Sequence, residues 1–297
     1  MSGCECKPAR SVSAIARNLQ HRAQPSSYEP VWKLKTMIAK VLTIAGSDPS
    51  GGAGIQADLK TFSRLRVYGM AVITALTAQN TKGVAAIQNV DPGFVGKQLD
   101  MVLADLPPDA VKTGILANAS IVEVVAAKFG EYGISKLVID PVLASTSGAP
   151  LLDPGAIDSL RRTLMPFALL VTPNAREAEI LAGREVRTIE SMEEAARAIH
   201  GYGPKYVLVK GGHIEGDATD ILFDGSRFLR FRSQRVAATD SHGTGCVLSA
   251  AIAAYLALGR DVVEAVQLGK QFVTEAIRNG LRIGSGRGPC DPLGLEK

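Results

Sequence analysis

The stretch VLTIAGSDPSGGAGIQADLKTF, residues 41–62, joins a short apolar run to an amphipathic segment through a turn rich in glycine. The run VLTIA has the length and β-branched content of a buried strand, and the segment after Ala53 has the spacing of a helix. A strand followed directly by a helix is typical of α/β folds. The turn GSDPSGGAG, residues 46–54, raises the question of what so flexible a backbone holds at the end of a strand.

The same alternation continues along the rest of the chain. Apolar runs that predict strands buried on both faces lie at residues 41–46, 71–78, 137–142, 168–173 and 206–212. Helical patterns lie at residues 53–66, 93–106, 118–130, 154–165, 174–183 and 191–203, and two long helices are expected at about 244–258 and 261–279. A hairpin is expected at DILFDGSRFLRF, residues 220–231, with Asp224 and Gly225 at its turn. The sequence therefore predicts an α/β fold, a mostly parallel sheet with helices on both sides.

Composition narrows the class of protein. The chain has 297 residues, 46% hydrophobic and 21% charged, and no apolar run reaches the length of a membrane span. Residues 1–40 hold seven Lys and Arg against two Glu, which leaves the remainder nearly neutral despite a net charge of +4. We therefore expect neither a nucleic acid nor a membrane as partner. We expect a basic, disordered extension over residues 1–38 and one folded domain over residues 39–297.

The four cysteines, Cys4, Cys6, Cys246 and Cys290, have neither the spacing of metal ligands nor that of a disulfide framework. Such usage favours a reducing cytoplasm. The basic extension lacks the apolar core of a secretory signal; a transit peptide is conceivable, and a disordered tail is the simpler interpretation.

Three interpretations compete for the glycine-rich turn. A Walker A loop requires lysine and then serine or threonine where Gly52 and Ala53 stand. A dinucleotide fingerprint is formally matched between Gly52 and Ala57, but no acidic residue for a ribose follows the strand at 70–78. What remains is a turn whose backbone packs closely against a small ligand. Asp58 is either part of that site or a favourable charge at the positive end of the next helix.

The segment TDSHGTGCVLSAAIAAYLALG, residues 239–259, carries the strongest chemical signal. The backbone N–H groups of Gly243, Thr244, Gly245 and Cys246 would converge at the start of an Ala-rich helix, where free amides and the helix dipole bind anions. Such donors stabilise the charge that develops in phosphoryl transfer. The alternative is a plain helix cap made by a serine or threonine side chain.

Cys246 lies in the first turn of that helix, where the pKa of a thiol can be lowered. A thiolate there could accept the proton of an alcohol nucleophile. The alternatives are a small buried apolar residue at Cys246 and His242 as the base.

Polar residues also follow other predicted strands, and in open sheets ligands bind beyond the carboxyl ends of the strands. Asn174 and Glu177 come just after one strand and suit Mg²⁺, which usually keeps several of its waters; a capping box is the alternative. Asp140 ends a second strand as a further Mg²⁺ or phosphate partner, and Lys210 ends a third, where it could meet a nucleotide phosphate.

With these motifs assembled, the chain resembles the ribokinase-like superfamily, and more closely the hydroxymethylpyrimidine/phosphomethylpyrimidine kinases of thiamine biosynthesis. The segments that carry the resemblance are TIAGSDPSGGAGIQADLKTF, GMAVITALTAQNTKGV, VKTGILA, VIDPVLASTSGAPLL, TPNAREAEIL, VKGGH and SHGTGC. They span residues 40 to about 285. The resemblance implies a three-layer α/β/α sandwich.

The resemblance also implies roles for individual residues. Gly46, Asp58 and Gln79 would line an aminopyrimidine site, with Ile115 and Val142 as apolar walls. Cys246 would be the catalytic residue, with Gly243, Thr244 and Gly245 as amide donors. Asn174, Lys210 and Thr244 would serve ATP, and Asp140 and Glu177 would serve Mg²⁺. Ile115 stands where relatives carry Met, and Cys246 stands where many superfamily members carry an Asp base.

The activity that the resemblance implies is ATP-dependent phosphorylation of 4-amino-5-hydroxymethyl-2-methylpyrimidine and then of its monophosphate to the diphosphate, by a cytoplasmic homodimer. The nearest alternative is a pyridoxal kinase of the same branch, because pyridoxal is also a ring with a hydroxymethyl group. An oxidoreductase that reads the glycines as a dinucleotide fingerprint and a non-catalytic regulator on a kinase fold are two further alternatives.

Overall fold

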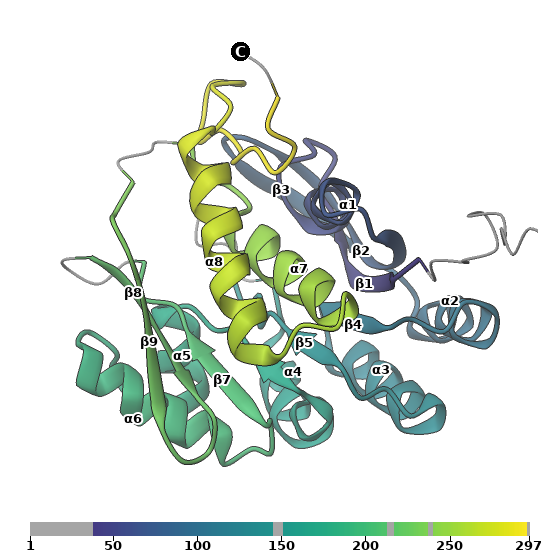
Figure 1. Ribbon diagram of the computed structural model, residues 1–297. Coiled ribbons are helices and arrows are strands. Elements are labelled where there is room, and N and C mark those ends of the chain that lie inside the picture. Colours follow the sequence, from purple (N-terminus) through teal and green to yellow (C-terminus); the bar gives the residue numbers. More distant parts are fainter. Residues whose placement is uncertain (1–37, 145–150, 213–216, 237–239, 296–297) are drawn as a thin grey trace, which may run out of the picture. The chain divides into compact units, whose positions relative to one another are not determined.

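The computed structural model describes residues 38–144, 151–212, 217–236 and 240–295 (Figure 1). The expected extension lies almost wholly outside these residues, so its disorder and the domain boundary stay predictions. Parts of three quoted segments, at residues 145–150, 213 and 239, also lie outside them.

A nine-stranded sheet forms the centre of the described part, in the order β3-β2-β1-β4-β5-β6-β7-β8-β9. Strands β2, β1, β4, β5, β6 and β7 are parallel, whereas β3, β8 and β9 run antiparallel to their neighbours. The strands are β1 (Lys40–Ser47), β2 (Tyr68–Asn80), β3 (Gly83–Asn89), β4 (Ala110–Thr113), β5 (Leu137–Ile139), β6 (Leu170–Val171), β7 (Tyr206–Val209), β8 (Ala218–Phe223) and β9 (Phe228–Ser233).

Helices cover both faces of this sheet (Figure 1). One layer consists of α1 (Gly54–Arg64), α7 (Thr244–Ala257) and α8 (Val262–Arg278). The other consists of α2 (Pro92–Asp105), α3 (Ala119–Tyr132), α4 (Pro154–Ser159), α5 (Ala175–Ala182) and α6 (Ile189–His200), with a π-turn (Leu160–Leu164) and a 3₁₀ turn (Met165–Phe167) after α4. The predicted three-layer α/β/α sandwich is confirmed.

The two cores follow from the alternation of side chains along each strand. In β1, Val41 packs with Phe62 and Val247 in the core beneath α1 and α7, and Leu42 packs with Leu99 and Val122 in the core beneath α2 and α3. Because both faces of the strand are buried, its sequence reads as a continuous apolar run. The hairpin of β8 and β9 is also confirmed, with Asp224 and Gly225 in its turn.

The apolar runs did not predict β3 and β4. Strand β3 lies at the edge of the sheet with most of its residues exposed, so it carries no apolar run. Strand β4 has four buried residues, one of which is Lys112, and this charged side chain interrupts the pattern.

The bend between β1 and α1 depends on close backbone contact. Gly54 has a φ of +56°, and a Cβ atom placed on it would lie 2.3 Å from the carbonyl oxygen of Gly46. Glycine is therefore required here both for its left-handed backbone and for space. The contact folds the bend back over the end of β1.

Replacing Gly54 by alanine should destabilise the fold more than the same change at Gly133, which has a φ of +65° and open space around it. Both variants adopt a left-handed backbone that costs roughly 1–2 kcal/mol, but only Gly54→Ala adds a collision with backbone. Urea unfolding followed by circular dichroism measures the difference. Equal losses of unfolding free energy would show that the contact with Gly46 relaxes freely.

Candidate active site

A cavity of about 980 Å³ opens where the parallel strands end, at their carboxyl termini. The glycine-rich bend, the ends of β2 and β4, the loop after β5, and the starts of α5 and α7 all contribute to its wall. Of the residues that the sequence singled out, it is lined by Gly46, Gln79, Ile115, Asp140, Val142, Asn174, Glu177, Lys210, Gly243, Thr244, Gly245 and Cys246. The structure thus brings together residues spread over two hundred positions of sequence.

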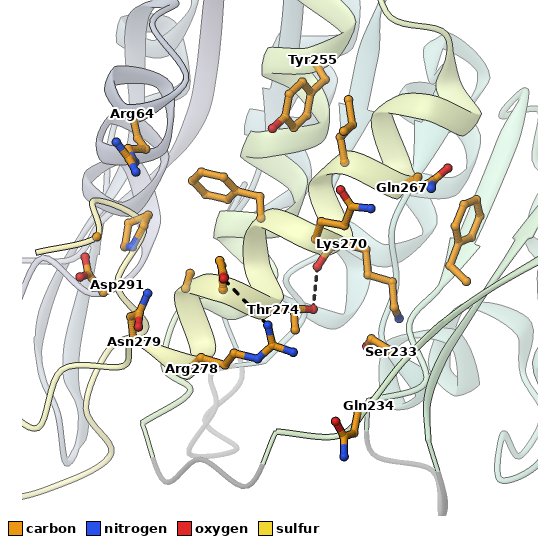
Figure 2. Close-up of a pocket in the computed structure, with 18 of the residues that line it drawn as sticks. Arg64, Ser233, Gln234, Tyr255, Gln267, Lys270, Thr274, Arg278, Asn279 and Asp291 are labelled. Atoms are coloured by element: carbon orange, nitrogen blue, oxygen red, sulfur yellow. Dashed lines mark hydrogen bonds and ion pairs between the residues drawn. The ribbon is translucent and has the colours of Figure 1, made fainter.

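Figure 2 shows a second hollow, of about 830 Å³, along α8. Tyr255, Asn279 and Asp291 are among its lining, and none of the residues predicted for the site faces it. Lys270 borders both hollows, but its ammonium is bound to Asp220 at 2.6 Å. The chemistry therefore concentrates in the strand-end cavity.

Asp58 lies behind the cavity wall, not on it, which corrects the expected hydrogen bond to a ligand. Its carboxylate is fully buried, accepts a hydrogen bond from Thr43 Oγ1 at 2.6 Å and pairs with Lys112 Nζ at 2.9 and 3.0 Å. Lys112, which the sequence analysis missed, is the member of this pair that borders the cavity. Burial alone would lower the pKa of Lys112, but the Asp58 carboxylate raises this pKa above its usual range. The only sequence signal was a lysine inside an apolar strand.

The start of α7 packs backbone against backbone on the glycine-rich bend. Gly243, the N-cap, has a φ of +80°, and a Cβ on it would lie 1.9 Å from the carbonyl oxygen of Gly52. Within the described residues no side chain caps this helix, which excludes the plain serine or threonine cap. The first amides of α7 therefore lie at the cavity beside the bend.

Asp140 and Lys210 meet next to this helix start. Lys210 Nζ lies 3.1 Å from Asp140 Oδ1, and Ser249 Oγ donates to Asp140 Oδ2 at 3.1 Å. A Cβ on Gly245 would be 3.5 Å from Lys210 Nζ and 3.7 Å from Asp140 Oδ2. Burial alone would raise the pKa of Asp140, but the ammonium of Lys210 holds this pKa below its usual range. A charged pair thus stands beside the amides of the Gly243–Gly245 turn.

Asn174 and Glu177 form the capping box that was the alternative to a Mg²⁺ site. Asn174 Oδ1 accepts from Glu177 N at 2.9 Å, and Glu177 Oε2 accepts from Asn174 N at 2.8 Å. Both residues nevertheless line the cavity. Burial raises the pKa of Glu177 to about 7, with the nearby Asp140 adding to the rise and Lys210 opposing it. Two close carboxyl groups, one of them poorly stabilised as an anion, fit a hard divalent cation.

The expected lowering of the Cys246 pKa is wrong. Burial raises the pKa of the thiol to about 11, and the favourable effect of Lys112 does not reverse this. The start of a helix favours a thiolate only where the sulfur remains hydrated enough to carry charge. Cys246 is therefore a neutral thiol at pH 7 in the unliganded protein.

A polar network that the sequence analysis missed joins the bend to the end of β2. His242 Nε2 lies 3.1 Å from Asp48 Oδ2 and 3.1 Å from the side-chain amide of Gln79. The Asp48 carboxylate also accepts from the backbone N–H groups of Ser50, Gly52 and Ala53. Burial alone would raise the pKa of Asp48, but the hydrogen bonds from His242 and Ser50 lower this pKa to about 2.

The backbone of His242 is held by a segment that follows α8. His242 N donates to Gly288 O at 3.1 Å, and Cys290 N donates to His242 O at 3.2 Å. This short parallel bridge, residues 288–290, fixes the loop before α7 from outside the sheet. No sequence motif pointed to Asp48 or to the bridge at residues 288–290, because neither belongs to residues that recur at a fixed spacing.

No helix within the described residues is long and apolar enough to span a membrane. No cluster of three or more His, Cys, Asp or Glu residues that could by itself hold a metal ion occurs in that part of the chain.

Comparisons with known proteins identify the family of this chain. The family model described as phosphomethylpyrimidine kinase matches residues 48–291. A thiamine biosynthesis bifunctional protein of Geobacter sulfurreducens is 52% identical over 85% of this chain, which spans about half (52%) of that protein. A hydroxymethylpyrimidine/phosphomethylpyrimidine kinase of Synechococcus elongatus is 48% identical over 84% of this chain and 95% of its own length. The pyridoxal kinase of Staphylococcus aureus, solved with AMP-PCP and pyridoxal, is 36% identical with a TM-score of 0.80, over 86% of this chain and 94% of that one.

Alkylation of Cys246 by iodoacetamide should be slow at pH 7 and should accelerate by roughly tenfold per pH unit up to about pH 10, because only the thiolate reacts. Mass spectrometry of the peptide that contains Cys246 gives the rate at each pH. Glutathione in the same tube is the reference for an unperturbed thiol. A rate that levels off at or below the pH where glutathione levels off would contradict the raised pKa.

Proposed function

The chain belongs to the phosphomethylpyrimidine kinase family, and we propose that the strand-end cavity is its active site. The enzyme phosphorylates 4-amino-5-hydroxymethyl-2-methylpyrimidine with ATP, and then the monophosphate to the diphosphate, in thiamine biosynthesis. The observation that carries the site assignment is the backbone contact between the glycine-rich bend and the start of α7. This contact supports an acceptor site on the bend next to an anion site at the start of α7.

The bend side of the cavity suits a flat ring. A Cβ on Gly46 would lie 3.4 Å from Ile115 Cδ1, so the glycine and this apolar side chain form one close-packed surface. Val142 lies at the same cavity, and the amide of Gln79 supplies both a donor and an acceptor. These groups match a ring that carries an amino group next to a ring nitrogen.

The helix side suits the transferred phosphoryl group. The amides of Gly243, Thr244 and Gly245 and the ammonium of Lys210 would face the charge that spreads over its oxygens. Thr244, Lys210 and Asn174 together would bind the phosphates of ATP. The acceptor oxygen then attacks the γ-phosphorus in line, and the bond from that phosphorus to the bridging oxygen of ADP breaks.

Cys246 would be hydrogen-bonded to the acceptor oxygen. Since its thiol is neutral before substrate binds, a pre-formed thiolate does not start the reaction. The acceptor hydroxyl becomes acidic only as its oxygen bonds to phosphorus, so its proton leaves late. For Cys246 to receive this proton, the thiol must first release its own proton to solvent in the complex with substrate and ATP. Positioning and amide charge carry most of the catalysis. In the second transfer the acceptor is already a phosphate anion and needs no base.

Asp140 and Glu177 would hold Mg²⁺ together with the phosphates of ATP. The ion accepts one or two carboxylates and keeps waters, which fits a pair of carboxyls where no third ligand lies close among the described residues. When bound, Mg²⁺ neutralises charge on the phosphates. Before Mg²⁺ binds, the positive charge of Lys210 offsets the repulsion between the carboxyl groups of Asp140 and Glu177.

We further propose a cytoplasmic homodimer. The described cysteines, Cys246 and Cys290, are both free, which suits a reducing compartment. Exposed apolar side chains occur at one end of the sheet, Leu76 and Ile87 on β2 and β3 and Phe94 and Met101 on α2, and such side chains favour a partner surface.

Pyridoxal is the second candidate acceptor, favoured by the fold similarity to pyridoxal kinase. The higher identity to the pyrimidine kinases supports the first reading. Membership of this kinase family also argues against the oxidoreductase alternative.

The preference for the pyrimidine over pyridoxal is tested by steady-state kinetics. The purified full chain is assayed with each acceptor at saturating Mg²⁺ and ATP. We expect the pyrimidine to give the higher kcat/KM, because only its ring pairs a donor and an acceptor with the amide of Gln79. ADP release measured with a coupled assay gives both values. A kcat/KM for pyridoxal at least as high would reverse the assignment.

Cys246→Ala should lower kcat for the first transfer by roughly 10²-fold if Cys246 becomes a thiolate in the complex with substrate and ATP and then takes the acceptor's proton. The second transfer, whose acceptor is already anionic, should lose much less. Rapid-quench assays that separate the monophosphate from the diphosphate measure both steps. Equal losses in the two transfers would mean that Cys246 serves positioning rather than proton transfer.

A further inference from the structure

The side-chain amide of Gln79 is held at both of its ends. One terminal atom lies 3.3 Å from Thr77 Oγ1, and the other lies 3.1 Å from His242 Nε2. The residue lines the cavity beside Gly46 and Cys246. The atom that faces Thr77 is Oε1, and the atom that faces His242 is Nε2.

Thr77 holds the oxygen end of the amide. Its hydroxyl lies 3.3 Å from Gln79 Oε1, to which it can donate, and 3.0 Å from the carbonyl oxygen of Ser47, which is a second acceptor. The hydroxyl has one proton, so these two acceptors share it.

His242 holds the nitrogen end of the amide. Its Nε2 lies 3.1 Å from Gln79 Nε2 and 3.1 Å from Asp48 Oδ2. The imidazole is thus held between the Asp48 carboxylate and the Gln79 amide. Each end of the amide therefore has one polar neighbour.

The imidazole itself is fixed by its surroundings. Its partner Asp48 is anchored by three backbone N–H groups of the glycine-rich bend. A Cβ on Gly52 would lie only 2.6 Å from His242 Cδ2, so the ring rests directly on the bend at a position that admits glycine alone. The bend therefore places a histidine as well as a ligand.

We propose that His242, held by Asp48, is a positioning residue that fixes the Gln79 amide at the cavity and thereby sets which acceptor ring the site selects. The contacts leave one N–H and one carbonyl lone pair of Gln79 for a ligand. That pair is complementary to an amino group beside a ring nitrogen, and an amide turned out of place would no longer meet both groups at once. This inference rests on the proposed function and identifies what reads the pyrimidine.

The test is a set of variants in the full chain, assayed for KM of the pyrimidine and of ATP. His242→Leu keeps an apolar side chain there but removes the ring nitrogen, whereas His242→Gln restores a polar group near the place of Nε2. Thr77→Val removes the contact at the other end of the amide. Each change is also made in a Gln79→Ala background, and thermal unfolding monitors folding.

If the inference is correct, His242→Leu raises the pyrimidine KM by about tenfold, the effect of a misplaced hydrogen-bond pair, while the ATP KM changes by less than about twofold. His242→Gln stays near wild type, and Thr77→Val shifts the pyrimidine KM in the same direction as His242→Leu. In the Gln79→Ala background neither His242→Leu nor Thr77→Val has a further effect, because both act through the amide.

Persistence of the His242→Leu effect in the Gln79→Ala background would overturn the inference, and so would failure of His242→Gln to restore the KM. If His242→Leu does not fold, Thr77→Val alone decides by the same comparison. Absence of pyrimidine turnover in the wild-type chain would instead overturn the proposed function, and would be seen before any variant is made.

Discussion

Everything at this site depends on the approach of two backbone turns, the glycine-rich bend after β1 and the turn that begins α7. Their separation leaves no room for a Cβ on Gly243, since it would stand 1.9 Å from a carbonyl oxygen of the bend. A contact of this kind is either made or lost, because backbone cannot rotate away as a side chain can. It ties the ring-binding side of the cavity to the anion-binding side, so an acceptor held by one turn lies within reach of a phosphoryl group held by the other.

Charge in the cavity wall is organised by pairing. Lys112 is bound by Asp58, Lys210 by Asp140 and Lys270 by Asp220, and each pair joins two different elements. These cations are thus fixed in place before any ligand arrives, and they need no reorganisation during transfer. The same pairing explains why Asp58, the most suggestive acid of the opening motif, lies behind the wall: it is occupied in holding a lysine of β4.

Most of the fold could be predicted from the sequence, but the details of the site could not. Continuous apolar runs found the strands that are buried on both faces, but β4 escaped because Lys112 interrupts it. The sequence offered both a lowered thiol pKa at the helix start and a small buried residue for Cys246. It could not decide between them, because burial depends on distant residues and sets the pKa. Asp48 and His242 are 194 positions apart, and no spacing rule connects them. Asn174 and Glu177 show that a cap and a place at the cavity can be the same two side chains.

The short bridge at residues 288–290 has a consequence for the order of events during translation. The bend, the sheet and α7 all leave the ribosome before the segment that clamps the backbone of His242. A nascent chain can therefore assemble its sandwich while the imidazole loop is still unrestrained. The pocket acquires its final shape only when residues 288–290 dock, so recognition of the ring matures after the sandwich has formed.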